Sequence, residues 1–102
     1  MPAVRYDKSR TSTRLYDWAS GQKLTVTAAS VRSTPIDSVE VMARPSVRGF
    51  LKVGDGTVEA ANTAGSISLE AGESFHLQIA QGQCVAFIRD TADGVLFLLP
   101  VA

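Results

Sequence analysis

The sequence predicts an all-β domain: an antiparallel β-sandwich, jelly-roll-like, with seven to eight strands. Apolar and polar residues alternate with a period of two from residue 24 onward, which is typical of half-buried strands. Turn residues recur about every 8–12 residues, the spacing found in sandwiches and small barrels. No stretch has the periodicity of an amphipathic helix.

Three strands are predicted before the middle of the chain. In the first, Leu24 and Val26 alternate with threonines, and Ser33-Thr34-Pro35 follows it. The second stops at Pro45, because proline has no amide hydrogen to donate to a neighbouring strand. The third is closed by the turn Gly54-Asp55-Gly56. These strands are residues 24–28, 39–44 and 47–53.

Four more strands are predicted after a loop at residues 57–65, which is rich in Ala, Thr and Asn. The clearest has Phe75, Leu77 and Ile79 alternating with polar residues. Short glycine-containing turns separate the four strands. They are residues 66–70, 74–79, 84–88 and 95–101.

The 102 residues suffice for one domain, which we place at residues 15–102, preceded by an extended arm at residues 1–14. Residues 7–14 contain no apolar side chain, so this segment cannot bury surface by itself. It is either a frayed terminus or an arm that becomes ordered on a neighbouring subunit. Residues 1–23 carry five basic and two acidic residues, 5 − 2 = +3, and residues 24–102 carry 5 − 8 = −3.

Catalytic machinery, a metal site and a cofactor are not expected, and we predict that the protein is not an enzyme. His76 is the only histidine and lies on the polar side of a strand, where a solvated or rim position is expected. Cys84 is expected to be a buried small hydrophobe, the alternative being a reactive or metal-binding thiol. The acidic residues that lie at predicted turns are explained by turn chemistry: Asp55, Glu70, Glu73, Asp90 and Asp93.

The net charge and the distribution of apolar residues also indicate which partners and which location to expect. The net charge of zero argues against general nucleic-acid binding. No stretch approaches the roughly 18 apolar residues of a membrane span, and no signal peptide is visible at the N-terminus. We therefore expect neither nucleic-acid nor membrane partners, and synthesis in a reducing cytoplasm.

The last strand, residues 95–101, is apolar on both faces, so both faces need to be covered. If Phe97 and its alternate neighbours face the core, Leu96 and Leu98 face outward. Pairing of this strand with residues 84–88 would add Ile88 to the same patch. We predict that Ile88, Leu96 and Leu98 form a homo-oligomer interface. The alternative is that the N-terminal segment with Leu15 and Trp18 folds over the patch.

Several motifs in residues 47–101 carry a resemblance. They are Val53-Gly54, the turn Leu69-Glu70-Ala71-Gly72-Glu73-Ser74-Phe75, the strand from Gly82 to Ile88, and the hairpin Asp93-Gly94-Val95-Leu96. This pattern resembles small β-sandwich structural proteins of tailed bacteriophages. The resemblance implies a protein that decorates or cements the capsid exterior, often as a trimer, or that sits in a head or tail appendage.

The expected function is therefore that of a virion structural protein, a capsid decoration or cement protein. It would be a homo-oligomer, with a trimer favoured, on the exterior of a capsid built in the host cytoplasm. Its arm would bind the major capsid protein through Arg5, Tyr6, Lys8, Arg10 and Arg14.

Two alternatives remain. One is a carbohydrate- or receptor-binding module in a head or tail appendage, for which Trp18, Tyr16 and Phe50 are candidate stacking residues. The other is an adaptor in the neck or tail, which differs from the leading reading only in location.

Overall fold

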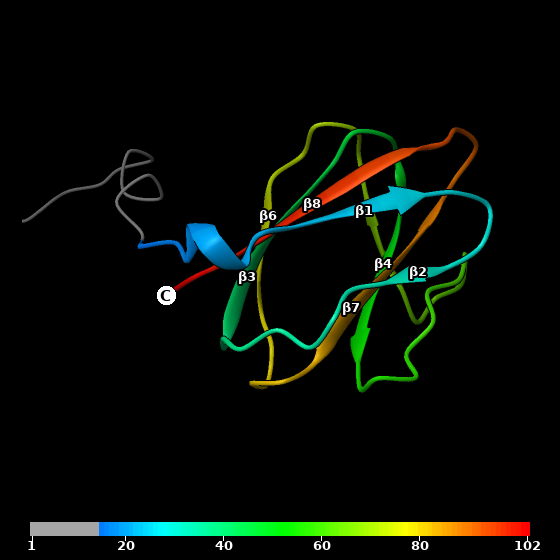
Figure 1. The fold of residues 1–102 in the computed structure, drawn as a ribbon. Coiled ribbons are helices and arrows are strands. Elements are labelled where there is room, and N and C mark those ends of the chain that lie inside the picture. Colours follow the sequence, from blue (N-terminus) through cyan, green and yellow to red (C-terminus); the bar gives the residue numbers. More distant parts are fainter. Residues whose placement is uncertain (1–14) are drawn as a thin grey trace, which may run out of the picture.

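The computed structural model describes residues 15–102, and the predicted arm at residues 1–14 lies outside the described residues. Within residues 15–102 no helix is long and apolar enough to cross a membrane. A single turn of 3₁₀ helix precedes eight strands (Figure 1). The elements are η2 (Trp18–Ser20), β1 (Gln22–Val26), β2 (Val31–Arg32), β3 (Glu40–Pro45), β4 (Gly49–Gly54), β5 (Ile67–Leu69), β6 (Phe75–Gln78), β7 (Cys84–Arg89) and β8 (Gly94–Pro100).

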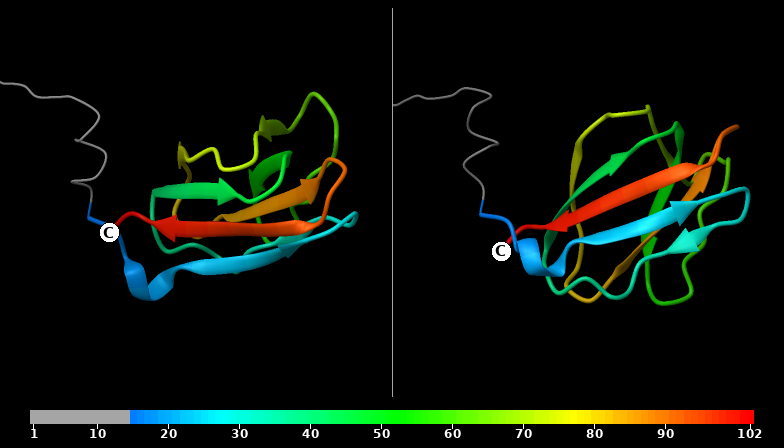
Figure 2. Two further views of the ribbon diagram at one scale, coloured as in Figure 1. Left: turned by 90° about the horizontal axis from the view of Figure 1, so that it is seen from above. Right: turned by 45° about the horizontal axis from the view of Figure 1, so that its top comes forward.

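The strands form two four-stranded sheets. The first has the order β1-β8-β3-β6, and the second has the order β2-β7-β4-β5. Every pairing between these strands is antiparallel. The two sheets lie as two layers, which the turned views separate (Figure 2). The predicted all-β antiparallel architecture is thus confirmed, with the strand number at the upper end of the predicted range.

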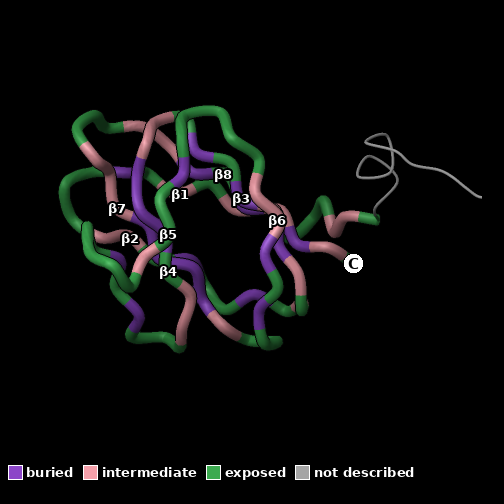
Figure 3. Tube along the Cα trace, turned by 180° about the vertical axis from the view of Figure 1, so that it is seen from behind, coloured by how far each residue is buried: buried purple, intermediate pink, exposed green. Residues whose placement is uncertain are grey.

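The core lies between the two sheets and is built from alternate residues of each long strand (Figure 3). Val26, Leu51, Val85 and Phe87 are completely buried there. Ser33 is the one buried polar residue found among the described residues. Its hydroxyl accepts a hydrogen bond from the Val85 amide at 2.9 Å, so this buried donor is satisfied.

The predicted orientation of the last strand is wrong. Leu96 and Leu98 are 0% and 2% exposed in the core, whereas Phe97 is 43% exposed on the outer face. Because both sets of side chains in this strand are apolar, alternation alone cannot choose between them. The pairing of β8 with its neighbouring strands determines which set faces inward. Leu98 lies opposite Ala43 of β3 and Leu96 lies opposite Leu24 of β1, and both Ala43 and Leu24 face the core.

The pairing of residues 84–88 with the last strand, which would have placed Ile88 in the same patch, does not occur. β7 lies in the second sheet between β2 and β4, and β8 lies in the first sheet between β1 and β3. Ile88 therefore sits on a different sheet from Leu96 and Leu98 and cannot form a surface patch with them. Because Leu96 and Leu98 are buried in the core and Ile88 lies on the other sheet, these three residues are not available as one homo-oligomer interface.

Candidate binding face

The outer face of the second sheet is covered by the chain itself. Val58 and Ala60, from the loop after β4, pack on Cys84 and Ala86 of β7, with Ile88 beside them. Two hydrogen bonds fix the loop: the Arg32 guanidinium donates to the Val58 carbonyl at 3.2 Å, and the Ala60 amide donates to the Ser30 hydroxyl at 2.9 Å. This loop makes a second, smaller hydrophobic cluster on the outside of the sheet.

Phe50 on the same face is also covered and only 7% exposed. The Arg48 guanidinium lies 5.3 Å from the centroid of its ring. Arg48 also pairs with Glu70 at 3.0 Å and with Asp90 at 2.7 Å. The hydrogen bonds to Glu70 and then to Asp90 raise the pKa of Arg48, so the guanidinium stays charged. Phe50 is therefore not available to stack on a sugar.

The outer face of the first sheet is different. Phe97 lies at its centre, with Lys23 of β1 opposite on one side and Arg44 of β3 opposite on the other. Leu99 lies two residues along β8, opposite Met42. Among residues 15–102, no loop crosses this face as the loop after β4 crosses the other sheet (Figures 1 and 2). A central aromatic side chain on this face is left open to solvent.

The segment that contains η2 borders this face. Its backbone is fixed to the end of β8: the Asp17 amide donates to the Pro100 carbonyl at 2.9 Å, and the Ala102 amide donates to the Leu15 carbonyl at 2.7 Å. The Tyr16 hydroxyl lies 2.7 Å from Nε2 of His76, on β6. Tyr16 therefore reaches from one end of the sheet to its β6 edge.

Trp18 stands at the border of this face and is 74% exposed. Its ring meets that of Tyr16 edge to face, with centroids 5.5 Å apart. A depression of about 420 Å³ lies among Trp18, Phe97 and Leu99, and Met42 also lines it. Lys23 and Arg44 are its charged lining residues. We call this depression and its rim the β8 face.

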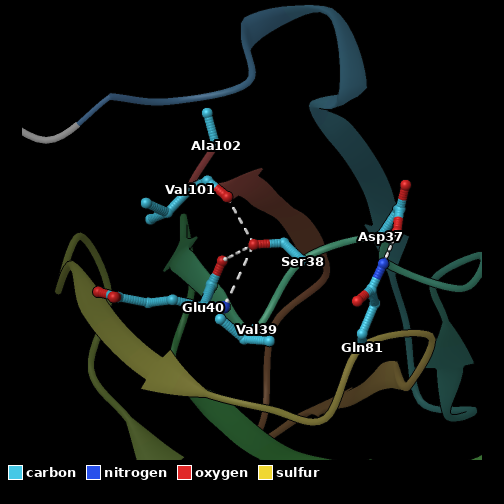
Figure 4. Close-up of a pocket in the computed structure, with 7 residues that line it drawn as sticks. All are labelled: Asp37, Ser38, Val39, Glu40, Gln81, Val101 and Ala102. Carbon is cyan, nitrogen blue, oxygen red and sulfur yellow. Dashed lines mark hydrogen bonds between the residues drawn. The ribbon is translucent and has the colours of Figure 1, made fainter.

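A second hollow lies at the C-terminal end of the described chain and is lined by Ser38, Glu40 and Gln81, among others (Figure 4). The Ser38 hydroxyl lies 2.5 Å from the Val101 carbonyl and 2.9 Å from the Glu40 carbonyl, and it accepts a hydrogen bond from the Glu40 amide at 3.2 Å. Gln81 donates a hydrogen bond to Asp37. The hydroxyl thus ties the end of β8 to the start of β3, which is a structural role.

Residues considered for chemistry take structural positions. Cys84 is buried, as predicted. Asp55 accepts hydrogen bonds from the Thr57 hydroxyl at 2.6 Å and the Thr57 amide at 2.8 Å, and these two bonds lower its pKa. Asp93 pairs with Arg89 four residues earlier. Within residues 15–102, no group of three or more His, Cys, Asp or Glu side chains is arranged to hold a metal ion.

The structure therefore brings together two of the predicted functional residues, Tyr16 and Trp18, and separates the others. The arm residues Arg5, Tyr6, Lys8, Arg10 and Arg14 lie outside the described residues. The side chains that sequence reasoning missed are those of the β8 face: Lys23, Met42, Arg44, Phe97 and Leu99. Their signal in the sequence is the strand at residues 95–101, which is apolar on both faces, but alternation alone does not tell which set of alternate residues faces outward.

Comparison with protein-family models, with curated proteins and with solved structures finds no match for this chain.

Proposed function

We propose that this chain is a virion structural protein, a capsid decoration or cement protein that acts by binding and not by catalysis. The observation that carries the proposal is the asymmetry of the sandwich. One outer face is covered by the chain's own loop, and the other presents exposed apolar and aromatic side chains with two cations. An exposed apolar patch with a polar rim is typical of an interaction site.

The strand order supports this proposal. From the orders β1-β8-β3-β6 and β2-β7-β4-β5 we infer an eight-stranded jelly roll, which is built from two Greek keys. This architecture occurs in viral capsid and lectin domains and in cupins. A cupin needs several histidines for its metal, and this chain has one. Because a fold hosts many functions, the support for this proposal comes from the β8 face and from the resemblance of residues 47–101 to bacteriophage structural proteins.

The mechanism we propose is mechanical. The β8 face docks on the major capsid protein, and the basic segment at residues 1–14 provides a second attachment through Arg5, Lys8, Arg10 and Arg14. Each bound copy then links neighbouring capsid subunits and opposes their separation. Self-association, for which we expect a trimer, must use a surface other than Ile88, Leu96 and Leu98.

Copy number tests the proposal. Virions produced from the genome that encodes the chain would be purified and quantified by mass spectrometry. A copy number comparable with that of the major capsid protein supports capsid decoration. A few copies per particle would place the chain in an appendage, and its absence from purified particles would overturn the proposal.

The second candidate function is carbohydrate binding, and Trp18 is the observation that favours it. Its exposed ring beside Phe97 offers two aromatic surfaces for stacking. A glycan array probed with the wild-type chain and with Trp18→Ala decides between the two. Binding to a defined glycan that Trp18→Ala abolishes would favour the second candidate.

A further inference from the structure

We propose that the β8 face binds an acidic protein segment, which inserts one large apolar side chain between Trp18 and Phe97 and pairs its carboxylates with Lys23 and Arg44. The proposal rests on the proposed function only in taking the β8 face as the binding surface. The chemistry of the partner is argued from the lining of this face alone, whether or not the partner is part of a capsid.

The need for an apolar side chain follows from the lining of the depression. Leu99 and Met42 lie opposite each other on adjacent strands, and Trp18 and Phe97 are the exposed aromatic residues of the lining. Burying a large apolar side chain contributes roughly 1.5–3 kcal/mol. Exposed Trp is also enriched among the residues that dominate binding energy at interfaces. The depression therefore suits a Phe, Trp or Leu side chain.

The need for acidic groups follows from the two cations. Lys23 and Arg44 flank Phe97 in one cross-strand row, and no ion pair joins either of them to a carboxylate of residues 15–102. Glu40 is on the same strand as Arg44 but two outward positions away, about 13 Å along the strand. The face thus carries two positive charges beside an apolar centre, and a partner gains most by bringing negative charge to both sides.

The row also sets a spacing. Adjacent strands lie about 4.8 Å apart, so the backbones that carry Lys23 and Arg44 are separated by roughly 10 Å, with Phe97 between them. A segment with acidic residues on both sides of an apolar one can form ion pairs with both Lys23 and Arg44 while its apolar side chain enters the depression.

The chain's own N-terminal segment is a poor occupant for this row. Residues 1–14 contain Arg5, Lys8, Arg10 and Arg14 and a single acidic residue, Asp7, so their net charge is 4 − 1 = +3. Such a segment would bring positive charge to Lys23 and Arg44. Like charges brought together oppose binding.

A second copy is disfavoured for the same reason. Two copies stacked face to face about a twofold axis through Phe97 would place Lys23 on Lys23 or on Arg44 of the other copy. Either arrangement brings cation onto cation. The charge pattern therefore favours a different, acidic chain.

A sugar is also a poor fit. A bound sugar buries several hydroxyl groups, each of which needs a hydrogen-bond partner. Gln22 is the uncharged polar side chain in the lining, and the backbone of Thr34 already occupies it. Its Oε1 accepts a hydrogen bond from the Thr34 amide at 3.0 Å, and its Nε2 donates to the Thr34 carbonyl. Lys23 and Arg44 carry hydrogen-bond donors only, so the lining offers the hydroxyl hydrogens of a sugar no uncommitted side-chain oxygen as acceptor.

The test is selection from a phage-displayed library of random dodecapeptides on the immobilised full-length chain. We expect enrichment of peptides with Asp or Glu on both sides of Phe, Trp or Leu. Selected peptides that contain no Trp would then be synthesised and titrated into the chain while the fluorescence of Trp18, its only tryptophan, is recorded. Insertion beside Trp18 is expected to shift its emission to shorter wavelength.

Matched variants assign the effect to this face. Lys23→Glu and Arg44→Glu are each expected to weaken peptide binding by about tenfold or more, and Trp18→Ala, followed by anisotropy of a labelled peptide, by about thirtyfold. Lys52→Glu is the control, because Lys52 is an exposed lysine on β4 of the other sheet and should leave affinity unchanged. Thermal unfolding of every variant checks the fold.

The outcomes separate this proposal from the proposed function. Enrichment of basic or uncharged peptides, or equal loss from Lys52→Glu and Lys23→Glu, would overturn the acidic partner whatever the virion copy number is. A concentration-dependent increase in mass that Phe97→Ser abolishes would make a second copy the occupant. Absence from virions together with strong acidic peptide selection would overturn the proposed function and leave the acidic partner standing.

Discussion

Phe97 and Leu98 are neighbours in the chain and have opposite surroundings. Leu98 is buried between the sheets, and Phe97 lies on the outer face between two cations. In a strand, one step along the chain moves a side chain to the other face of the sheet. The contribution of a residue to stability in β8 is therefore set by its position in the alternation and not by its hydrophobicity.

Truncation of these neighbours should have very different costs. Leu98→Ala is expected to lower the free energy of unfolding by about 2–5 kcal/mol, because it removes buried atoms and leaves a cavity. Phe97→Ala should cost less than about 1 kcal/mol, since much of its ring is already in water. Urea unfolding measures both. A larger cost for Phe97→Ala would show that the orientation of β8 is the reverse.

Ser33 offers a second test at this scale. Ser33→Ala removes the acceptor of the buried Val85 amide and is expected to cost about 1–3 kcal/mol. Ser68→Ala, at an exposed position of β5, is the control and should change the free energy of unfolding by less than about 0.5 kcal/mol. Equal effects in the two variants would contradict a special role for the Ser33 hydroxyl.

Asp55 gives a pH-dependent prediction. Its pKa lies below its ordinary value of 3.8 because the Thr57 hydroxyl and amide donate to the carboxylate. The contribution of the Asp55 carboxylate to the free energy of unfolding is therefore fully present above pH 3.8. It is lost as the pH falls through the lowered pKa. In Thr57→Val the pKa of Asp55 should rise, which an NMR titration of its carboxyl carbon measures. An unchanged pKa would refute the role of the hydroxyl.

At the scale of elements, the start of β4 packs closely on β7. A Cβ at Gly49 would lie 2.5 Å from the Ile88 carbonyl oxygen and 2.5 Å from the ring of Phe87. Neither the backbone of β7 nor a buried ring can move away easily. Any side chain at position 49 would push the two strands apart.

Gly49→Ala is accordingly expected to lower the free energy of unfolding by at least about 1–3 kcal/mol. Gly56→Ala, in the turn after β4, is the matched control, since a Cβ there would meet nothing within 4 Å. It should be neutral or slightly stabilising. Thermal unfolding of the two variants side by side tests the contrast, and a well-folded Gly49→Ala would contradict the close approach.

At the scale of the whole molecule, the sequence predicts the architecture well and the exposed surface poorly. β6 was predicted within one residue, because its apolar residues alternate strictly with polar ones. β2 was missed, because two residues are too short to carry a period. The cover over the second sheet was missed as well, since Val58 and Ala60 lie in an irregular segment whose contacts depend on distant residues.

The candidate site shows the same limit. The sequence indicated that one apolar set in residues 95–101 would need a cover, but the choice between the two sets depends on pairing with β1 and β3. Neighbouring strands in this sheet are far apart in the sequence, so Lys23 and Arg44 gave no sign of sharing a row with Phe97. Tertiary pairing, and not local pattern, creates the β8 face.

The position of Leu15 beside Ala102 has a consequence for how firmly the protein attaches. The basic segment joins the described chain only four residues before Trp18, so both proposed attachments begin at the same end of the sandwich (Figure 1). Once one of them is engaged, the other is held near its own target at an effective concentration of the order of millimolar. Two contacts that are each weak and reversible would together hold a copy through avidity, and loss of either one would release it.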